Sequence, residues 1–310
     1  MAQTINTNMP SLNAQRNLTT SQGSLATSMQ RLSSGLRVNS AKDDAAGLAI
    51  AERMNTQIKG MNVAIRNAND GISFAQTAEG ALSKIGDNLQ RMRELAIQSR
   101  NATNSEGDRT NLQKEFSQLQ SEIDRTIKNA KFNGGSLFSS ASTTLDFQVG
   151  AGTDLSDKIT VNAVKLGGGN AGTAGQAIAA TSGNVNVLMA TLTSGNTTGA
   201  TTATGIAIGG TSAIGGTQID EAIQVIDNAL TQINDKRAEF GAVQNRFDAV
   251  VAQLQVSVEN ESAARGRIMD ADFAAETANL SRAQILQQAG TAMLTQANQL
   301  PQSVLQLLQG

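Results

Sequence analysis

The residue types that most often perform catalysis or bind metals are scarce in this sequence. The chain of 310 residues contains no His and no Cys, which removes the usual zinc sites, the thiolate nucleophiles and the commonest general base. Carboxylates, Lys, Ser and Thr remain available, but no spacing gathers them into a cluster. We therefore predict that the protein is not an enzyme and that it has no cofactor and no metal site.

Two short motifs could carry other chemistry. Asp270-Ala271-Asp272 has the Asp-x-Asp form of calcium loops, but no further ligands or glycine follow at the required spacing, so a helix cap at Asp270 or Asp272 is the better interpretation. Asn196-Thr197-Thr198 has the form of an N-glycosylation sequon. Because such triplets also arise by chance, it is weak support for glycosylation.

Charge and hydropathy exclude several partners. The 24 basic and 26 acidic residues give a net charge of -2, and no basic stripe interleaved with aromatic residues is present, so no nucleic acid is expected. Residues 1–17 lack both the basic and the apolar region of a cleavable secretory signal peptide. No run approaches the roughly 18 apolar residues of a membrane span.

Both chain ends carry apolar residues at helical spacing with almost no charge beside them. Arg282 is the only charged residue from 281 to 310, and no acidic residue precedes Asp43. A coiled coil that remains exposed to water usually carries Glu and Lys beside its apolar stripe, so these ends are expected to be covered by other copies. The residues predicted to pack there are Leu18, Leu25, Met29, Leu32 and Leu36, then Leu286, Met293, Leu300, Val304 and Leu307, with Gly290 and Ala297 in the same stripe.

Ordering these ends costs about 1 to 2 kcal/mol per residue, whereas each Leu-sized residue buried returns about 1.5 to 3 kcal/mol. Our hypothesis is that both ends are disordered in the monomer and fold when neighbouring copies cover them. Pro10 is placed to begin a helix, and Pro301 is expected to kink a helix or to end a segment.

Long helices are predicted between the ends. Ser40 and Asp43 suit a capping box for a helix from about 41 to 100, roughly 90 Å long. Residues 101–107 form a polar break, and Ser105 or Asp108 can cap a second helix that Asn133-Gly134-Gly135 stops. A heptad run from Ile219 to Val258 predicts a helix of roughly 70 Å, long enough to lie along the first.

Alternating apolar residues at 145–149 and 159–163 predict one β-hairpin. Residues 167–216 are rich in Gly, Thr and Ala and read as a variable surface excursion. The expected fold is mainly α, a long antiparallel coiled-coil rod built from both chain ends. The expected domains are 1–40 with 270–310, 41–166 with 217–269, and 167–216.

Two stretches resemble the bacterial flagellins: LSSGLRVNSAKDDAAGLAIAERM at 32–54 and NRFDAVVAQLQVSVENESAARGRIMDADFAAETANLSRAQILQQAG at 245–290. The resemblance implies an extracellular subunit that self-assembles into the flagellar filament for swimming, exported through the flagellar type III apparatus. It implies terminal helices that line the filament channel, and as partners an export chaperone, hook-associated proteins and cap proteins. The alternative is a hook-filament junction protein, which shares terminal helices of this type.

The resemblance also implies recognition by a vertebrate Toll-like receptor. The matching stretch is LQRMRELAIQ, with Arg91 and Leu95 one helical turn apart and Glu115 on the next helix. The alternative is that Arg91 is a solvated or subunit-contact residue, Leu95 a packing residue, and Glu115 half of an ion pair. The tail VLQLLQG similarly resembles the segment sensed by cytosolic inflammasome receptors.

Overall fold

The computed structural model describes residues 7–138, 144–162, 164, 166, 206–209 and 216–308, and the side chains of all of these except 216, 217 and 300–308. The chain divides into two compact units, one made of residues 1–59 and 257–310 (unit 1) and one of residues 60–256 (unit 2). Among the described residues, none of the helices is both long and apolar enough to cross a membrane. The domain boundaries expected from the sequence stay predictions.

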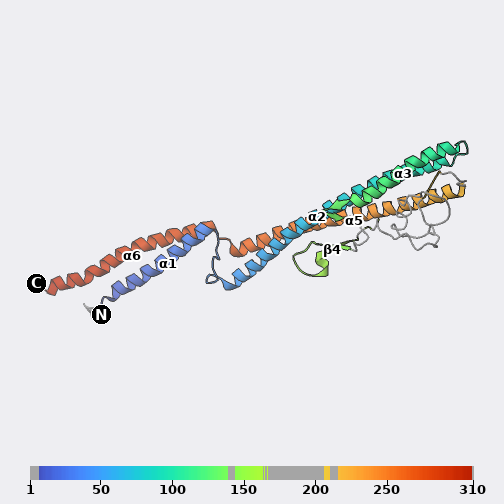
Figure 1. Ribbon diagram of the computed structural model, residues 1–310. Coiled ribbons are helices and arrows are strands. Elements are labelled where there is room, and N and C mark those ends of the chain that lie inside the picture. The colour runs from blue at the N-terminus through green and yellow to red at the C-terminus, as the bar shows by residue number, and fades with distance from the viewer. Residues whose placement is uncertain are drawn as a thin grey trace. The chain divides into compact units, whose positions relative to one another are not determined.

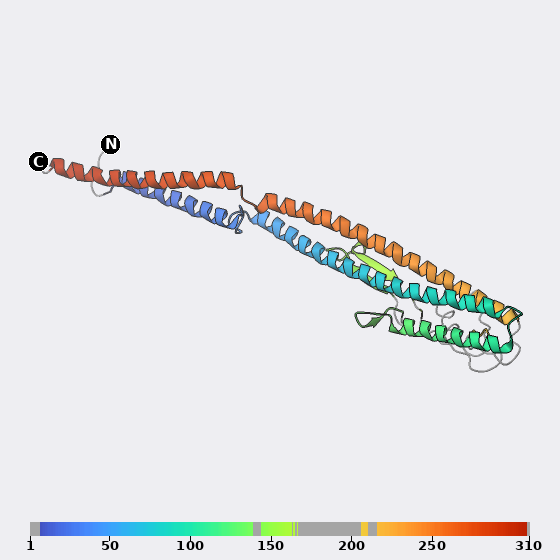
Figure 2. The same ribbon diagram turned by 90° about the horizontal axis from the view of Figure 1, so that it is seen from above.

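The terminal helices of unit 1 are α1 (Met9–Ser34) and α6 (Phe273–Leu308), which lie side by side (Figures 1 and 2). The amide of Asn8 donates to the Ala297 carbonyl at 2.8 Å, while Glu276 near the start of α6 meets Arg31 near the end of α1. The two helices are therefore antiparallel. Asn8 caps α1 and Pro10 lies in its first turn, as predicted. Pro301 does not end α6, because a proline removes one backbone hydrogen bond without forcing the chain out of the helix.

The ends of α1 and α6 are joined through a short backbone pairing. Gly35 adopts the left-handed conformation at φ 71°, which favours glycine, and its carbonyl accepts from the Ala271 amide at 2.9 Å. Leu36 and Asp270 form an isolated antiparallel bridge. Asp272 then caps α6 by accepting from the amides of Ala274 and Ala275, which confirms the cap interpretation at that residue.

The second helix, α2, runs from Ala45 to Ser99 rather than from residue 41. The predicted capping residue Asp43 instead closes a turn by accepting from the amides of Asn39 and Ser40. Asp44 takes the capping role, because its carboxylate accepts from the Gly47 amide at 2.8 Å. The predicted capping box of Ser40 and Asp43 therefore does not begin the helix, because α2 starts at Ala45, after Asp44.

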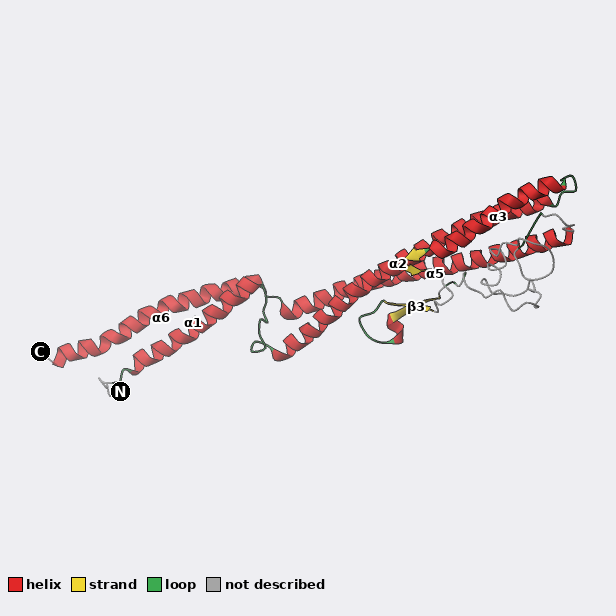
Figure 3. Ribbon diagram, in the orientation of Figure 1, coloured by secondary structure: helices red, strands yellow, loops and turns green. Residues whose placement is uncertain are grey.

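Unit 2 contains the larger part of α2 with α3 (Glu106–Asn129) and α5 (Gly216–Met269), shown in Figure 3. Ser105, one of the two predicted caps, begins α3 and forms a capping box with Asp108. Arg93 pairs with Asp227 and Arg100 with Asp220, so α5 runs antiparallel to α2. The helices bury a continuous apolar core that includes Leu82, Ile85, Leu89, Met92, Leu95, Phe116, Ile123, Ile226 and Phe247.

Two strand pairs complete unit 2. The predicted hairpin is confirmed: β3 (Thr144–Gln148) pairs antiparallel with β4 (Lys158–Asn162), with Phe147 opposite Ile159. A short helical turn, η1 (Leu155–Asp157), precedes β4. Sequence reasoning missed a second pair, β1 (Lys131–Phe132) and β2 (Gly135–Ser136). Asn133 and Gly134, expected only to stop a helix, both have positive φ and form its two-residue turn.

The mainly α fold, with antiparallel long helices from both chain ends and a small β-hairpin, is confirmed. Ala163 of the predicted hairpin, the sequon at 196–198 and most of the predicted excursion at 167–216 lie outside the described residues. Within that excursion, Ile208 is buried, and its carbonyl accepts from Ser99 Oγ at 2.6 Å.

Candidate functional site

The contact between α1 and α6 is built from small side chains. Within residues 9–34 and 273–299, the buried side chains are Ser11, Ser21, Ser28, Glu276, Ala283 and Ala297. Gly290 belongs to the same face, since a Cβ placed on it would lie 3.2 Å from Leu18 Cδ1. Small residues let the helix backbones approach closely but remove little apolar area from water. The pair is therefore held by a thin interface.

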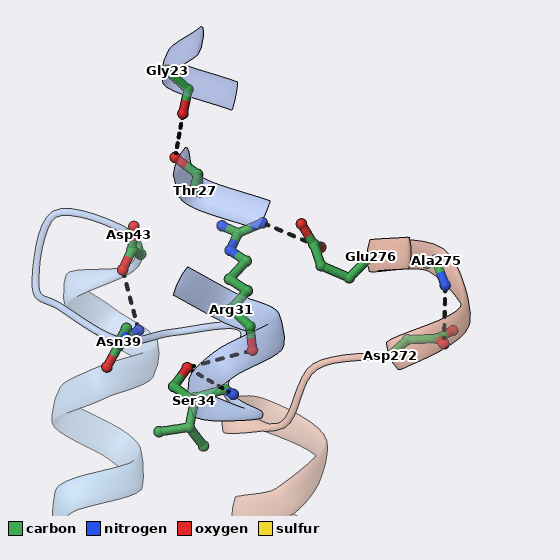
Figure 4. Close-up of polar contacts among 10 residues, drawn as sticks. Gly23, Thr27, Arg31, Ser34, Asn39, Asp43, Asp272, Ala275 and Glu276 are labelled. Carbon is green, nitrogen blue, oxygen red and sulfur yellow. Dashed lines mark hydrogen bonds and ion pairs between the residues drawn. The ribbon is translucent and has the colours of Figure 1, made fainter. Parts of the chain in front are cut away.

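One ion pair joins α1 to α6 among the described residues. Arg31 Nη1 lies 4.0 Å from Glu276 Oε2, and Glu276 is 8% exposed (Figure 4). The charged groups lie next to the joint at Gly35, where Ser34 Oγ accepts from the Leu36 amide. A buried carboxylate without its cationic partner would be costly, so this pair favours one register of the two helices.

Six large apolar side chains of this helix pair are exposed, whereas Leu18, Leu25, Leu32, Leu280 and Leu294 are half-buried. Ile285, Leu286 and Met293 of α6 are 64%, 53% and 65% exposed. On α1, Met9, Leu12 and Met29 are 64%, 49% and 56% exposed. We call these six residues the outer apolar set. Because exposed apolar surface rimmed by polar residues marks interaction sites, we take these exposed faces of α1 and α6 as the candidate functional site.

A groove runs beside these residues between the two helices. It has a volume of about 1100 Å³, and Leu18, Arg31, Leu286 and Met293 are among the residues that line it. Gln, Asn, Ser and Thr surround the apolar residues, and Arg282 is the only charged residue between 281 and 310. Arg31, Glu276 and Arg282 also line the groove, so a helix that occupies it must leave these charges in contact with water or with an opposite charge.

The structure places the predicted packing residues in two groups. Leu18, Leu25, Leu32 and Leu36 are half-buried, whereas Met29, Leu286 and Met293 are exposed in the single chain. Leu300, Val304 and Leu307 belong to α6, but their side chains are outside the described ones. Their packing in an assembled polymer stays a prediction.

Sequence reasoning missed the stripe of α6 that faces α1. The half-buried and buried positions are Leu280, Ala283, Gln287, Gly290, Leu294 and Ala297, spaced by three and four. The predicted stripe shared only Gly290 and Ala297 with it. Because α6 has apolar residues on two adjacent stripes, the sequence allows either stripe to be assigned as the one that faces α1. The predicted stripe is the one with Leu286 and Met293, which the structure leaves exposed.

The residues predicted for receptor recognition lie in unit 2. Arg91 donates to Glu115 Oε1 at 2.9 Å and to Glu94 Oε2 at 2.8 Å, which links the surfaces of α2 and α3. The hydrogen bond to Glu94, followed by that to Glu115, raises the pKa of Arg91. Leu95 is 0% exposed. The structure thus brings Arg91 and Glu115 together at the surface and places Leu95 in the core.

Comparison with known proteins identifies the family. The pattern of the bacterial flagellin N-terminal helical region matches residues 5–143, and that of the C-terminal helical region matches residues 223–308. A flagellin of Xenorhabdus nematophila is 45% identical over 317 residues, which cover 99% of this chain and 100% of the relative. The chain belongs to the bacterial flagellin family. A second flagellin, from Halalkalibacterium halodurans, is 40% identical over 98% of this chain and 99% of its own.

As a flagellin, the chain is a structural protein and not an enzyme. Flagellins self-assemble into the flagellar filament outside the cell, which drives swimming. A flagellar hook-associated protein from Vibrio parahaemolyticus has a similar fold, with a TM-score of 0.55, 15% identity, and coverage of 74% of this chain and 100% of its own. Fold alone does not separate flagellins from hook-associated proteins; the sequence identity to flagellins does.

Proposed function

We propose that the outer apolar set is covered by neighbouring copies in the filament, and that α1 and α6 form its inner layer and line its channel. The observation that carries this proposal is the division of side chains on α6. Small residues such as Ala283 are buried in the contact with α1, while Ile285, Leu286 and Met293 stay more than half exposed. Covering the exposed part of each large side chain contributes on the order of 1 kcal/mol, repeated in every subunit of the polymer.

The test uses a double variant, Leu286→Gln with Met293→Gln, because Gln preserves helix propensity and is common in this helix. The matched control is Thr291→Gln with Thr295→Gln, two exposed positions of the same helix. We expect the critical concentration for salt-induced polymerisation to rise at least about tenfold for the first pair and to change little for the second. Polymerisation of the first pair at the parent's critical concentration would contradict the proposal.

We also propose that the α1–α6 pair becomes stably ordered only in the polymer. The thin interface supports this, because it returns little free energy against the entropy of ordering two long helices. Limited proteolysis of the free monomer should trim both ends while sparing unit 2. The same protease should leave the ends intact in sedimented polymer, and an untrimmed monomer would contradict this part.

Before assembly, the exposed residues of the outer apolar set have no neighbouring copies to bind them. We propose that the chain leaves the cell through the flagellar type III apparatus, with an export chaperone on α6, and that hook-associated and cap proteins contact it at the filament ends. Exposed Leu286 and Met293 with few charges around them support a chaperone. Titration calorimetry with a flagellar export chaperone should show binding to the parent and weaker binding to the Leu286→Gln, Met293→Gln variant; equal binding would count against it.

Recognition by a host Toll-like receptor is a second proposed function. Arg91, in the stretch that resembles the recognised segment, and its ion-pair partner Glu115 on α3 are both exposed, which supports it. Because Leu95 is buried, we propose that it acts by holding the α2 backbone while Arg91 and Glu115 supply the contact surface. Arg91→Ala should reduce the response of receptor-bearing cells at least about tenfold, and Lys84→Ala, also on α2, should not. An unchanged response to Arg91→Ala would overturn this proposal.

A further inference from the structure

The turn between β1 and β2 contains the one Asn-Gly sequence of the chain, Asn133-Gly134. Both residues are exposed, with φ of 47° and 80°. An Asn that precedes Gly can react with its own backbone, because the next amide nitrogen can attack the side-chain carbonyl and Gly has no side chain to hinder it. Two Asn-Ser sequences, Asn39-Ser40 and Asn104-Ser105, offer a comparison. The reactivity of each site depends on what the attacking amide contacts.

At both Asn-Ser sites the amide that would attack is already hydrogen-bonded to a carboxylate. The Ser40 amide donates to Asp43 Oδ2 at 2.9 Å, and the Ser105 amide donates to Asp108 Oδ2 at 3.0 Å. A nitrogen that donates to an ionised carboxylate holds its proton more firmly, and it must break this bond before it can attack. The two Asn-Ser sites are therefore protected by the turns that carry them.

The turn at Asn133 lacks this protection. Within the described part of the chain, no hydrogen bond engages the Gly134 amide or the Asn133 side chain. A Cβ added to Gly134 would have no atom within 4 Å, so the space that ring closure needs is open. The two strands that the turn joins are each two residues long. Because such a short ladder restrains the turn weakly, the backbone can rotate into the conformation that ring closure requires.

We propose that Asn133 is a site of spontaneous modification, at which the Gly134 nitrogen attacks Asn133 Cγ. The bond between this nitrogen and Cγ forms, the bond between Cγ and Nδ2 breaks, and the amide proton leaves with Nδ2 as ammonia. Water then opens the resulting succinimide ring. Attack of water at Cγ gives an aspartate, and attack at the backbone carbonyl gives an isoaspartate, whose chain continues through the side-chain carbon. One water is consumed and one ammonia is released, without oxidation or reduction.

An isoaspartate would add one carbon atom to the backbone of a two-residue turn. Before the turn, the Phe132 ring packs edge-on against Phe74 with the ring centroids 5.6 Å apart. After the turn, the amide of buried Leu137 donates to the Ala130 carbonyl at 3.0 Å. The length of the turn fixes the spacing of these two anchors. The modification therefore loosens the contact of the β1–β2 hairpin with the core of unit 2.

The experiment compares two Asn-Gly sequences in one full-length chain. Ser40→Gly gives Asn39 the same small neighbour as Asn133 and keeps the backbone amide that donates to Asp43. The folded monomer is incubated at mildly alkaline pH, and isoaspartate is located by enzymatic methylation followed by peptide mass spectrometry. We expect isoaspartate to form at position 133 at least about tenfold faster than at position 39. Equal rates at the two positions, or no isoaspartate at position 133, would overturn the proposal.

The same chain unfolded in guanidinium chloride is the control for sequence effects. There we expect the two rates to agree within about threefold, because neither amide is then hydrogen-bonded to a carboxylate. A tenfold difference that persisted in the unfolded chain would overturn the protection assigned to the Ser40 amide.

A second measurement reads the structural effect of the modification. The isoaspartate form is purified from aged monomer and compared with Asn133→Asp, which carries the same added charge on a normal backbone. We expect the Leu137 amide to exchange with solvent at least about fivefold faster in the isoaspartate form, and within about twofold of the parent in Asn133→Asp. Equal exchange in these two forms would overturn the predicted loosening of the hairpin.

Discussion

In unit 2, helices α2, α3 and α5 bury Leu, Ile, Met and Phe side chains, many of them fully, whereas the paired helices α1 and α6 of unit 1 bury Ser and Ala. Both associations are formed by long helices with apolar residues at heptad spacing. They differ in where the large side chains lie. Unit 2 places Leu82, Leu89 and Phe247 inside, and the terminal pair leaves Ile285 and Met293 outside.

This difference teaches that heptad spacing alone does not say which surface a helix buries within its own chain. Unit 2 buries its apolar stripes in its own core and carries ion pairs such as Arg100–Asp220 at its surface. The terminal pair leaves large apolar residues exposed and has almost no charged rim. Under the proposed function, unit 2 is stable by itself and the terminal pair is completed by neighbouring copies.

The largest expected effect tests the core of unit 2. Leu89→Ala removes a fully buried side chain and should lower the free energy of unfolding by about 2 to 5 kcal/mol, because it leaves a cavity. The matched variant Leu286→Ala, on exposed α6, should change it by less than about 0.5 kcal/mol. Urea unfolding of the monomer followed by circular dichroism measures both. Similar decreases in unfolding free energy for the two variants would contradict the difference between unit 2 and the terminal helices.

The next effect concerns the ion pair of the terminal helices. Glu276→Ala or Arg31→Ala leaves one charged group without its partner in a partly buried site, which should destabilise the pair of helices by about 1 to 3 kcal/mol. The reversed pair, Arg31→Glu with Glu276→Arg, should recover part of the loss. Amide hydrogen exchange of α1 and α6 in assembled polymer would measure this loss of stability. If the charge-reversed variant regained no stability, Arg31 and Glu276 would not interact as a pair.

A smaller effect distinguishes two helical glycines. Gly80 on α2 has no atom within 4 Å of an added Cβ, whereas Gly290 on α6 would meet Leu18 at 3.2 Å. Gly80→Ala should stabilise the chain by about 0.5 to 1 kcal/mol through helix propensity. Gly290→Ala should gain less, because Leu18 must shift. Thermal unfolding of monomer and polymer tests this order, and an equal gain for both would show that α1 and α6 are not closely packed.

The smallest expected effect is a pH dependence of local stability, at Asp43 in unit 1 and at Asp108 in unit 2. Hydrogen bonds from the Asn39 amide and the Ser40 side chain lower the pKa of Asp43 below its usual 3.8, and the Ser105 hydroxyl and amide do the same for the pKa of Asp108. A lowered pKa in the folded state means that the ionised carboxylate stabilises. This stabilisation is complete above about pH 4 and is lost as the pH falls through the lowered values.

We therefore expect the Asn39–Asp43 turn and the start of α3 to open on acidification below about pH 4. Amide exchange measured at Ser40 and Ser105 should accelerate beyond the intrinsic pH trend in the parent. Asp43→Asn should abolish that acceleration at Ser40 and leave it unchanged at Ser105. Loss of the acid dependence at both turns in Asp43→Asn would show that they are not independent.

Much of the fold could be predicted from the sequence because its local signals are strong. The cap of α3 at Ser105 and the alternation at 145–149 each act within a few residues, and both were confirmed. The start of α2 was misplaced, because Ser40 and Asp43, the predicted capping box, form a turn before the helix and Asp44 caps it instead.

The candidate site was less predictable, since it depends on contacts between distant segments. Periodicity shows that Leu286 and Leu294 both lie on apolar stripes, but not that α1 covers only the second. The sequence left two roles open for Arg91 and Leu95, and the structure places Leu95 in the core and Arg91, one turn earlier, at the surface.

The antiparallel pairing of α1 with α6 joins residues from opposite ends of the chain, and Asn8 and Ala297 are 289 positions apart. Such a contact closes almost the whole chain into one loop, which is the slowest kind of contact to form. Turns and hairpins within unit 2 close over much shorter distances. Under the proposed function, the helices that neighbouring copies cover are also the ones whose pairing forms last, because it joins residues from both ends of the chain.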